Sequence, residues 1–295
     1  MKIFDCCMYY DEDLVLDLRL NYLDKYVDKF IIVESEFTHS GQKRKLRFDK
    51  KIFSKFKNKI DYIVLENQPK NLSKIDEDDS DNLKNSKYIM NAVKRENFQR
   101  NKLSEGLKSA TNSDLIIISD VDEIPNLEHI DSHLNNKIIL FKQTFFYYKF
   151  NLKLLDYEWF GSRACRKKDL RSPQWLRNIK NKVYPKWRID TVFSKKKYSD
   201  IGIVKNGGWH FSNIKTPADI EKKMKNYLHH REYELNPIGE NQIKDIIEKR
   251  KAIYNLKSDM RKNKFDSEND LIFTEMKELP LYLQNNIEKF KEWLI

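Results

Sequence analysis

The stretch LIIISDVDEIP, residues 115–125, changes abruptly from apolar to acidic. Its first half is short and rich in β-branched residues, which is typical of a buried strand in a parallel sheet. In open α/β sheets, ligands bind beyond the carboxyl ends of the strands. We therefore expect a ligand site at Asp120 and Asp122.

These two acids lie two positions apart, so a turn or bulge would bring both carboxylates to one divalent cation. Carboxylate oxygens suit Mg²⁺ or Mn²⁺, which take few protein ligands and complete their shell with water and substrate phosphates. The alternative for a bare Asp-x-Asp is a solvated turn after a strand. The buried strand before the pair and Glu123-Ile124-Pro125 after it favour the metal site.

Outward from this strand, apolar and amphipathic segments alternate along the chain. Strands are predicted over residues 2–8, 30–34, 62–65 and 115–120, and helices over residues 11–27 and 88–108. The polar, acidic residues 67–87 between them predict a surface loop. Alternation of this kind predicts an α/β fold with a mostly parallel sheet flanked by helices.

Composition narrows the function only slightly. The 295 residues can bury a sizeable core, and 7 Gly with 7 Pro argue against a repeat or low-complexity protein. The net charge of +11 favours phosphate-bearing partners. Cys6, Cys7 and Cys165 lack metal-ligand spacing, so reduced thiols are expected.

The N-terminus carries no apolar signal core, and no window approaches the ~18 apolar residues of a membrane span. We therefore expect a cytoplasmic protein without a transmembrane segment. Peripheral contact with a membrane is compatible with its basic surface, because anionic lipid attracts Lys and Arg clusters.

A second motif is GGWHFS, residues 207–212. Two of the seven glycines stand together here, which indicates a sharp turn or a close approach of the backbone to a ligand. His210 is a candidate third metal ligand or phosphate contact, because imidazole is a common metal ligand. The alternative is a packed, hydrogen-bonded histidine beside Trp209 and Phe211.

The chain resembles glycosyltransferase family 17, which includes the β-1,4-mannosyl-glycoprotein β-1,4-N-acetylglucosaminyltransferases. Four stretches carry the resemblance in the same order: FIIVES at 30–35, RENFQRN at 95–101, SDVDEIP at 119–125 and GWHFS at 208–212. Weaker matches lie at residues 172–177 and 230–233. Together they cover roughly residues 1–235, which we expect to form the catalytic domain, with residues 236–295 as a helical C-terminal extension packed on it.

The resemblance implies a GT-A-like, Rossmann-type fold and an inverting glycosyltransferase. Its donor would be UDP-GlcNAc and its acceptor a glycan or another carbohydrate. Mn²⁺ or Mg²⁺ would be held by Asp120, Asp122 and His210, acting as a Lewis acid on the leaving diphosphate.

Several further side chains are expected at the donor. Arg95 and Arg100 on one predicted helix, and Lys43 in a basic loop, are the cations we expect near the phosphates, beside Asp120. Glu34 ends a strand, and contact with the donor's base or ribose is one reading; a helix cap or a salt bridge is the other.

Inverting transfer also needs a base for the acceptor hydroxyl. Asp122 is expected to serve catalysis through the metal, and the candidate bases are Asp156, Glu158 and Glu232, of which Glu232 is favoured by the weak match at 230–233.

Two other classes of protein share some of these features. Haloacid-dehalogenase phosphatases also place Asp-x-Asp after an apolar strand, but Pro125 stands where a small Gly-Thr continuation is expected, and the motif comes late in the chain. A non-enzymatic nucleic-acid-binding protein would explain the basic charge and the aromatic residues. Scattered acids and the lack of a binding motif count against it, so no nucleic-acid partner is expected.

Overall fold

The computed structural model describes residues 1–185, 187, 190–254 and 269–295. Its strands are β1 (Ile3–Tyr9), β2 (Lys29–Ser35), β3 (Ile60–Leu65), β4 (Leu115–Asp120), β5 (Glu123–Pro125), β6 (Ile138–Tyr147), β7 (Leu152–Arg166), β8 (Ile201–Val204), β9 (Gly208–Ser212) and β10 (Leu271–Phe273). Its helices are α1 (Asp13–Leu23), α2 (Asp81–Lys102), α3 (Pro173–Arg177), α4 (Asp190–Phe193), α5 (Pro217–Asn226), α6 (His230–Leu235), α7 (Gly239–Glu248), α8 (Leu281–Gln284) and α9 (Ile287–Phe290).

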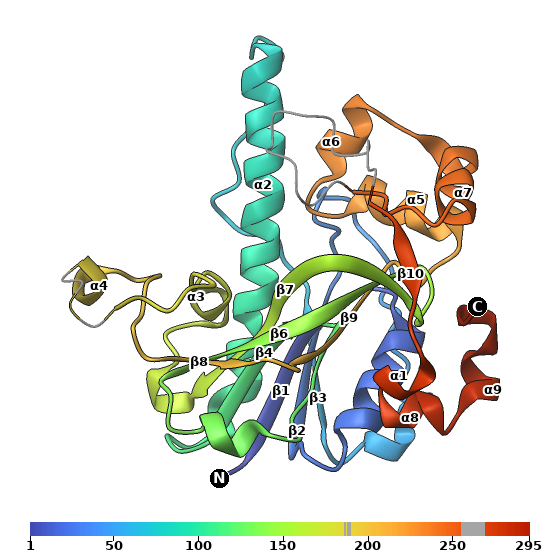
Figure 1. Ribbon diagram of the computed structural model, residues 1–295. Coiled ribbons are helices and arrows are strands. Elements are labelled where there is room, and N and C mark those ends of the chain that lie inside the picture. Colours follow the sequence, from blue (N-terminus) through green and yellow to red (C-terminus); the bar gives the residue numbers. More distant parts are fainter. Residues whose placement is uncertain (186, 188–189, 255–268) are drawn as a thin grey trace.

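The strands form one curled mixed sheet in the order β3-β2-β1-β4-β7-β6-β9-β5, with β8 beside β6 and β10 beside β7 (Figure 1). The first four strands are parallel, and Met8 of β1 lies opposite both Val33 of β2 and Asp120 of β4. The carboxyl ends of these strands therefore share one edge. The predicted α/β class with a mostly parallel, GT-A-like sheet is confirmed.

Strand β4 is buried on both faces, as its apolar run predicts. Leu115 and Ile117 belong to one hydrophobic cluster, and Ile116 and Ile118 belong to another on the opposite face. Helix α1 packs on the first face, while the turn of 3₁₀-helix after α2 packs on the second. Successive side chains of β4 thus enter opposite clusters, and this alternation fixes the register of the strand that leads to Asp120 and Asp122.

The second half of the sheet brings distant motifs together. The long strand β7 runs antiparallel to both β4 and β6, and β9 runs parallel to β6. Strand β5, only three residues long, pairs antiparallel with β9, so that Glu123 lies opposite His210. This pairing places the histidine motif directly beside the turn that follows β4.

One helix predicted from the sequence agrees with the structure, and one predicted loop is shorter than expected. The ambiguous segment at 11–27 is helical, as α1, in agreement with the prediction. The predicted surface loop at 67–87 is too long, because α2 begins at Asp81 instead of residue 88. The physical reason is an N-cap: the Ser80 hydroxyl accepts from the backbone N–H of Leu83, and Lys87 on the first turns pairs with Asp79.

The C-terminal residues contribute a strand as well as helices. Strand β10 pairs with β7, and Leu279, Leu283 and Phe290 lie fully or almost fully buried in the cluster that also contains α1. Figure 1 shows α8 and α9 beside α1. A domain boundary at residue 235 stays a prediction. Within the described ranges, no helix is both long and apolar enough to cross a membrane.

Removal of the Phe290 ring tests how firmly this C-terminal segment is built into the core. Phe290→Ala is expected to lower the free energy of unfolding by about 3–5 kcal/mol, because the ring is fully buried against Phe150 and Tyr282. Leu281→Ala, at a side chain that is 55% exposed, is the matched control and should change it by about 0.5 kcal/mol or less. Urea denaturation followed by circular dichroism measures both. Equal stability of the two variants would contradict integration of this segment with the core.

Candidate active site

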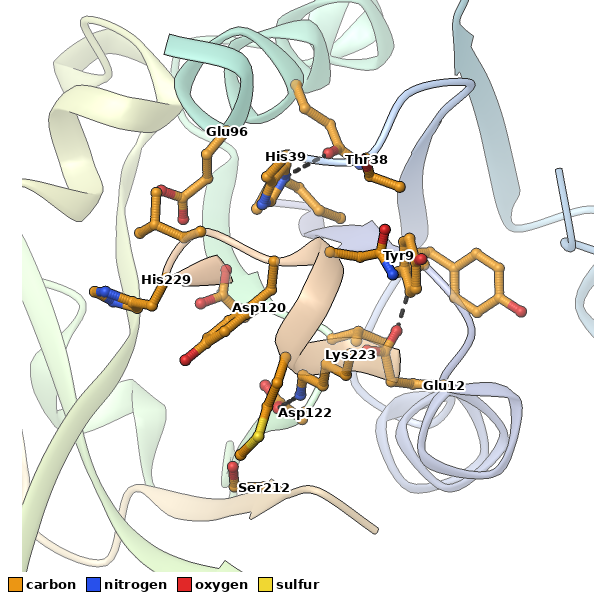
Figure 2. A pocket seen from close by; sticks show the side chains of 18 of the residues that line it. Tyr9, Glu12, Thr38, His39, Glu96, Asp120, Asp122, Ser212, Lys223 and His229 are labelled. Atoms are coloured by element: carbon orange, nitrogen blue, oxygen red, sulfur yellow. Dashed lines mark hydrogen bonds and ion pairs between the residues drawn. The ribbon is translucent and has the colours of Figure 1, made fainter. Parts of the chain in front are cut away.

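A cavity of about 430 Å³ opens at the shared carboxyl edge of β1, β2 and β4. Its walls come from the loops after these strands, from the end of β9 and from the last turns of α5. Figure 2 shows Asp120 and Asp122 facing this space, with Lys223 of α5 beside Asp122 and Glu96 of α2 and His229 near Asp120. The site lies where the sequence predicts it, at the end of the apolar strand.

A fully buried arginine fixes the turn that carries the acids. Arg19 of α1 donates from Nε and Nη2 to both oxygens of Asp5 at 2.7 and 2.6 Å. Its Nη1 donates to the carbonyls of Asp120, Val121 and Glu123 at 3.1, 3.3 and 2.6 Å. Burial alone would lower the pKa of Arg19, but Asp5 raises it above its ordinary value. The guanidinium therefore stays charged beneath the turn.

Glu123 anchors the same turn from the other side. Its carboxylate is fully buried and accepts from the backbone N–H of Asp120 at 2.9 Å and from the Trp159 indole at 2.8 Å. Arg177 of α3 pairs with both of its oxygens at 2.8 and 3.1 Å. Glu123 is thus a structural acid.

Asp120 is held between two arginines. Arg100 of α2 contacts Oδ1 at 3.0 Å, and Arg177 contacts Oδ2 at 2.9 Å. Burial opposes ionisation of this carboxyl, yet Arg177 and Arg100 together bring its pKa well below the usual range. Asp120 is consequently an anion with one cation on each oxygen.

Asp122 has a different environment. His210 Nε2 lies 3.4 Å from Oδ1, and Lys223 Nζ lies 3.9 Å from Oδ2. Burial opposes ionisation here too, but His210 and then Lys223 lower the pKa of this carboxyl on balance. The backbone N–H of Phe211 donates to the Asp122 carbonyl at 2.8 Å, which ties β9 to the turn.

Gly208 makes this close approach of β9 feasible. Its φ is +112°, and a Cβ there would lie 2.1 Å from the carbonyl oxygen of Ile124 in β5. Any side chain would therefore push β9 away from β5 and carry His210 with it.

Asp122 and His210 are the residues best placed to hold a divalent cation. They offer one oxygen and one nitrogen at the cavity, and His210 Nδ1 is buried without a hydrogen-bond partner among the described residues. No group of three or more His, Cys, Asp or Glu side chains in those residues is arranged to hold a metal. The Asp122 carboxylate suits Mg²⁺ or Mn²⁺, because these ions commonly combine few protein ligands with water and substrate phosphates, whereas imidazole is a less usual ligand for them.

The other predicted site residues do not line the cavity. Glu34 is fully buried and accepts from the Tyr62 hydroxyl at 2.8 Å and from Arg44 at 2.9 Å. Of the two roles that the sequence suggests for Glu34, donor contact or a helix cap or salt bridge, the structure shows a salt bridge, with Arg44. Lys43 is 74% exposed and reaches only Glu36, at 3.7 Å.

Three predicted residues reach the cavity through a neighbour. Arg95 donates to the His39 carbonyl at 3.2 Å, and Arg100 acts on Asp120. Glu232 lies 3.2 Å from His229 Nδ1, and His229 lines the cavity. The other candidate bases, Asp156 and Glu158, belong to β7 and are not among the lining residues.

Sequence reasoning missed the two arginines that organise the turn. One signal was available for Arg19: it stands three residues after Leu16 and four before Leu23, on the buried stripe of α1. A charged residue on an apolar stripe requires a buried partner. Arg177 lies within the weak family match at residues 172–177, but that match suggests no role for it, and its partners are 54 and 57 residues away.

The GT-A-like sheet and the acidic turn at its cavity are the arrangement expected of an α/β glycosyltransferase. The family model of glycosyltransferase family 17 matches residues 1–295, and the chain belongs to this family. No curated protein matches the sequence. Its substrates are therefore a sugar donor and a sugar acceptor. The family match does not favour the alternative hypotheses of a phosphatase or a nucleic-acid-binding protein.

Arg19→Met should destabilise the protein strongly. The free energy of unfolding is expected to fall by about 3–5 kcal/mol, because Asp5 would remain buried without its cation and the carbonyls of the turn would lose their donor. Arg47→Met, at an exposed pair 3.7 Å from Asp13, is the control and should cost about 1 kcal/mol or less. Thermal and urea unfolding measure both; a small effect of Arg19→Met would argue against this account of the turn.

Proposed function

We propose that the protein is a metal-dependent, inverting glycosyltransferase that moves N-acetylglucosamine from UDP-GlcNAc to a glycan or another carbohydrate. The observation that best supports this function is the grouping of Asp122, His210 and Lys223 at the end of β4, within a cavity whose volume lies in the usual range for small-molecule sites. The identity of the sugar rests on the family resemblance.

Mn²⁺ or Mg²⁺ would be held by Asp122 and His210, with Asp120 beside them. When bound, it would supply Lewis-acid stabilisation of the departing diphosphate. Asp120 contributes mainly as a tethered anion, since both of its oxygens already have arginine partners.

The chain's own cations support departure of the leaving group. The Lys223 ammonium projects from α5 toward Asp122 across the cavity (Figure 2) and is available to donate to phosphate oxygens. Glu34 and Arg95 would support donor binding indirectly, through Arg44 and His39, which do line the cavity. Lys43 contributes long-range charge at most.

For the base we propose His229, oriented by Glu232. The imidazole lines the cavity, and its Nδ1 lies 3.2 Å from Glu232 Oε1. A carboxylate on one ring nitrogen orients the imidazole and stabilises its cationic form, leaving the other nitrogen to take a proton from the acceptor hydroxyl. Glu232 is thus a positioning residue in this scheme.

Asp122→Asn tests the cation site. The variant should fold normally but lose metal-dependent release of UDP from UDP-GlcNAc, because the amide is a poor ligand for the cation and leaves its charge uncompensated. We would measure nucleotide release from a panel of sugar nucleotides with Mn²⁺, Mg²⁺ or chelator, and donor binding by calorimetry on the same samples. Asp131→Asn, at an exposed acid, is the control. Full metal-dependent turnover by Asp122→Asn would exclude this role.

Glu232→Gln tests the base. We expect kcat to fall by roughly 10²–10⁴-fold while the KM for the donor changes little, since the pair would act on the acceptor. His229→Ala should have a similar effect, and the double variant should be no worse than His229→Ala if the two act as a unit. Glu234→Gln on the same helix, at an exposed acid that pairs with Arg231, is the control. Independent, multiplicative losses would argue against the pair.

A further inference from the structure

More than half of the net charge of the protein is concentrated in one short segment. Residues 180–198 contain seven basic residues and one acidic residue, Asp190, a net +6 against +11 for the whole chain. Asp190 itself is paired with Lys197 at 2.9 Å. We call this segment the basic finger. None of the residues of this segment that the structure describes lines the cavity.

The base of the basic finger is a narrow ribbon. Lys180 N–H donates to the Lys196 carbonyl at 2.8 Å, and Tyr184 N–H donates to the Tyr198 carbonyl at 3.1 Å. Tyr184 is 9% exposed, and the ammonium groups of Lys182 and Lys197 each lie 5.8 Å from the centroid of its ring. Figure 1 shows α4, at the tip, on the far left of the molecule and well away from the sheet.

The tip exposes two large aromatic side chains. Trp187 is 79% exposed and Phe193 is 84% exposed, whereas the next most exposed large apolar side chain of the described residues, Ile52, is 62% exposed. Val183 adds a third apolar side chain at 43%. Lysines flank these residues and are themselves exposed: Lys180, Lys182, Lys195 and Lys196.

We propose that the basic finger docks the enzyme onto an anionic lipid surface. Aromatic side chains prefer the interface between headgroups and acyl chains, and flanking Lys and Arg are attracted to anionic headgroups. Trp187 and Phe193 would enter this interface while the lysines contact lipid phosphates. A nucleic acid fits less well, because its phosphates favour a basic face or groove, whereas here the charge surrounds a projecting apolar tip.

The finger is also joined to the active site by α3. The Trp175 indole donates to the Lys195 carbonyl at 2.9 Å, and two residues later Arg177 pairs with Asp120 and Glu123. Docking through the finger would therefore hold the catalytic cavity in a fixed orientation relative to the membrane. The proposal concerns location and does not depend on the identity of the donor.

The test is co-sedimentation of the full chain with vesicles. Binding is expected to vesicles of phosphatidylcholine with phosphatidylglycerol, weakly or not at all to phosphatidylcholine alone, and less at high salt. Lys195→Gln/Lys196→Gln should weaken binding by roughly thirtyfold, taking the usual contribution of each lysine near such a surface. Trp187→Ala/Phe193→Ala should weaken it by tenfold or more.

Matched controls distinguish the effect of the basic finger from general effects of surface charge and surface hydrophobicity. Lys50→Gln/Lys51→Gln removes the same charge from another exposed pair, and Ile52→Ala/Leu281→Ala removes exposed apolar side chains elsewhere. Both control variants should bind like the wild-type protein. UDP-sugar hydrolysis or transfer in solution should be unchanged in the finger variants, so that failure of docking is distinguishable from failure of the proposed chemistry.

Insertion has its own readout. Brominated lipids should quench the fluorescence of the protein, and Trp187→Phe should lose most of this quenching while keeping its binding. The proposal would be overturned by a lack of binding to anionic vesicles or by equal losses of binding in the control variants. It would also be overturned if the protein bound duplex DNA as tightly as anionic vesicles and this binding did not depend on Trp187 and Phe193.

Discussion

The buried ion pair between Arg19 and Asp5 is the interaction on which the catalytic edge of the sheet depends. It joins helix α1, strand β1 and the turn after β4 through one guanidinium, which uses donors on all three of its nitrogens. Burial of two charges is costly, and here good geometry and three carbonyl acceptors offset the cost. Arginine suits this place because its planar fork can serve a carboxylate and a turn at the same time.

Around that fixed turn, Asp120, Asp122 and Glu123 have different hydrogen-bond and ion-pair partners. Glu123 is closed in by an indole, an arginine and a backbone N–H, and Asp120 is balanced by two arginines. Asp122 alone meets a histidine and a lysine at longer distances, which leaves its oxygens more accessible to a ligand. Identical or similar side chains therefore differ in function because the backbone points them into different surroundings.

The parts of this arrangement that are local in sequence could be predicted. The apolar run of β4, the acids at its end and the alternation of elements specify the strand, the site edge and the fold class. Contacts across long separations could not: His210 reaches Asp122 only because β5 pairs with β9, and Arg177 arrives from a five-residue helix. The environment of Glu34 could not be predicted either. This acid ends a strand near the cavity, but its carboxylate is buried and accepts from the backbone N–H groups of Arg47 and Phe48.

Gly208 illustrates how a residue that binds nothing can specify chemistry. Because its missing side chain leaves room for the Ile124 carbonyl, it determines how near His210 comes to Asp122. In evolution, glycine at 208 and histidine at 210 would then be inherited as one unit. A relative that keeps the histidine but replaces the glycine would retain the residue in its sequence, yet its histidine would no longer lie beside the aspartate.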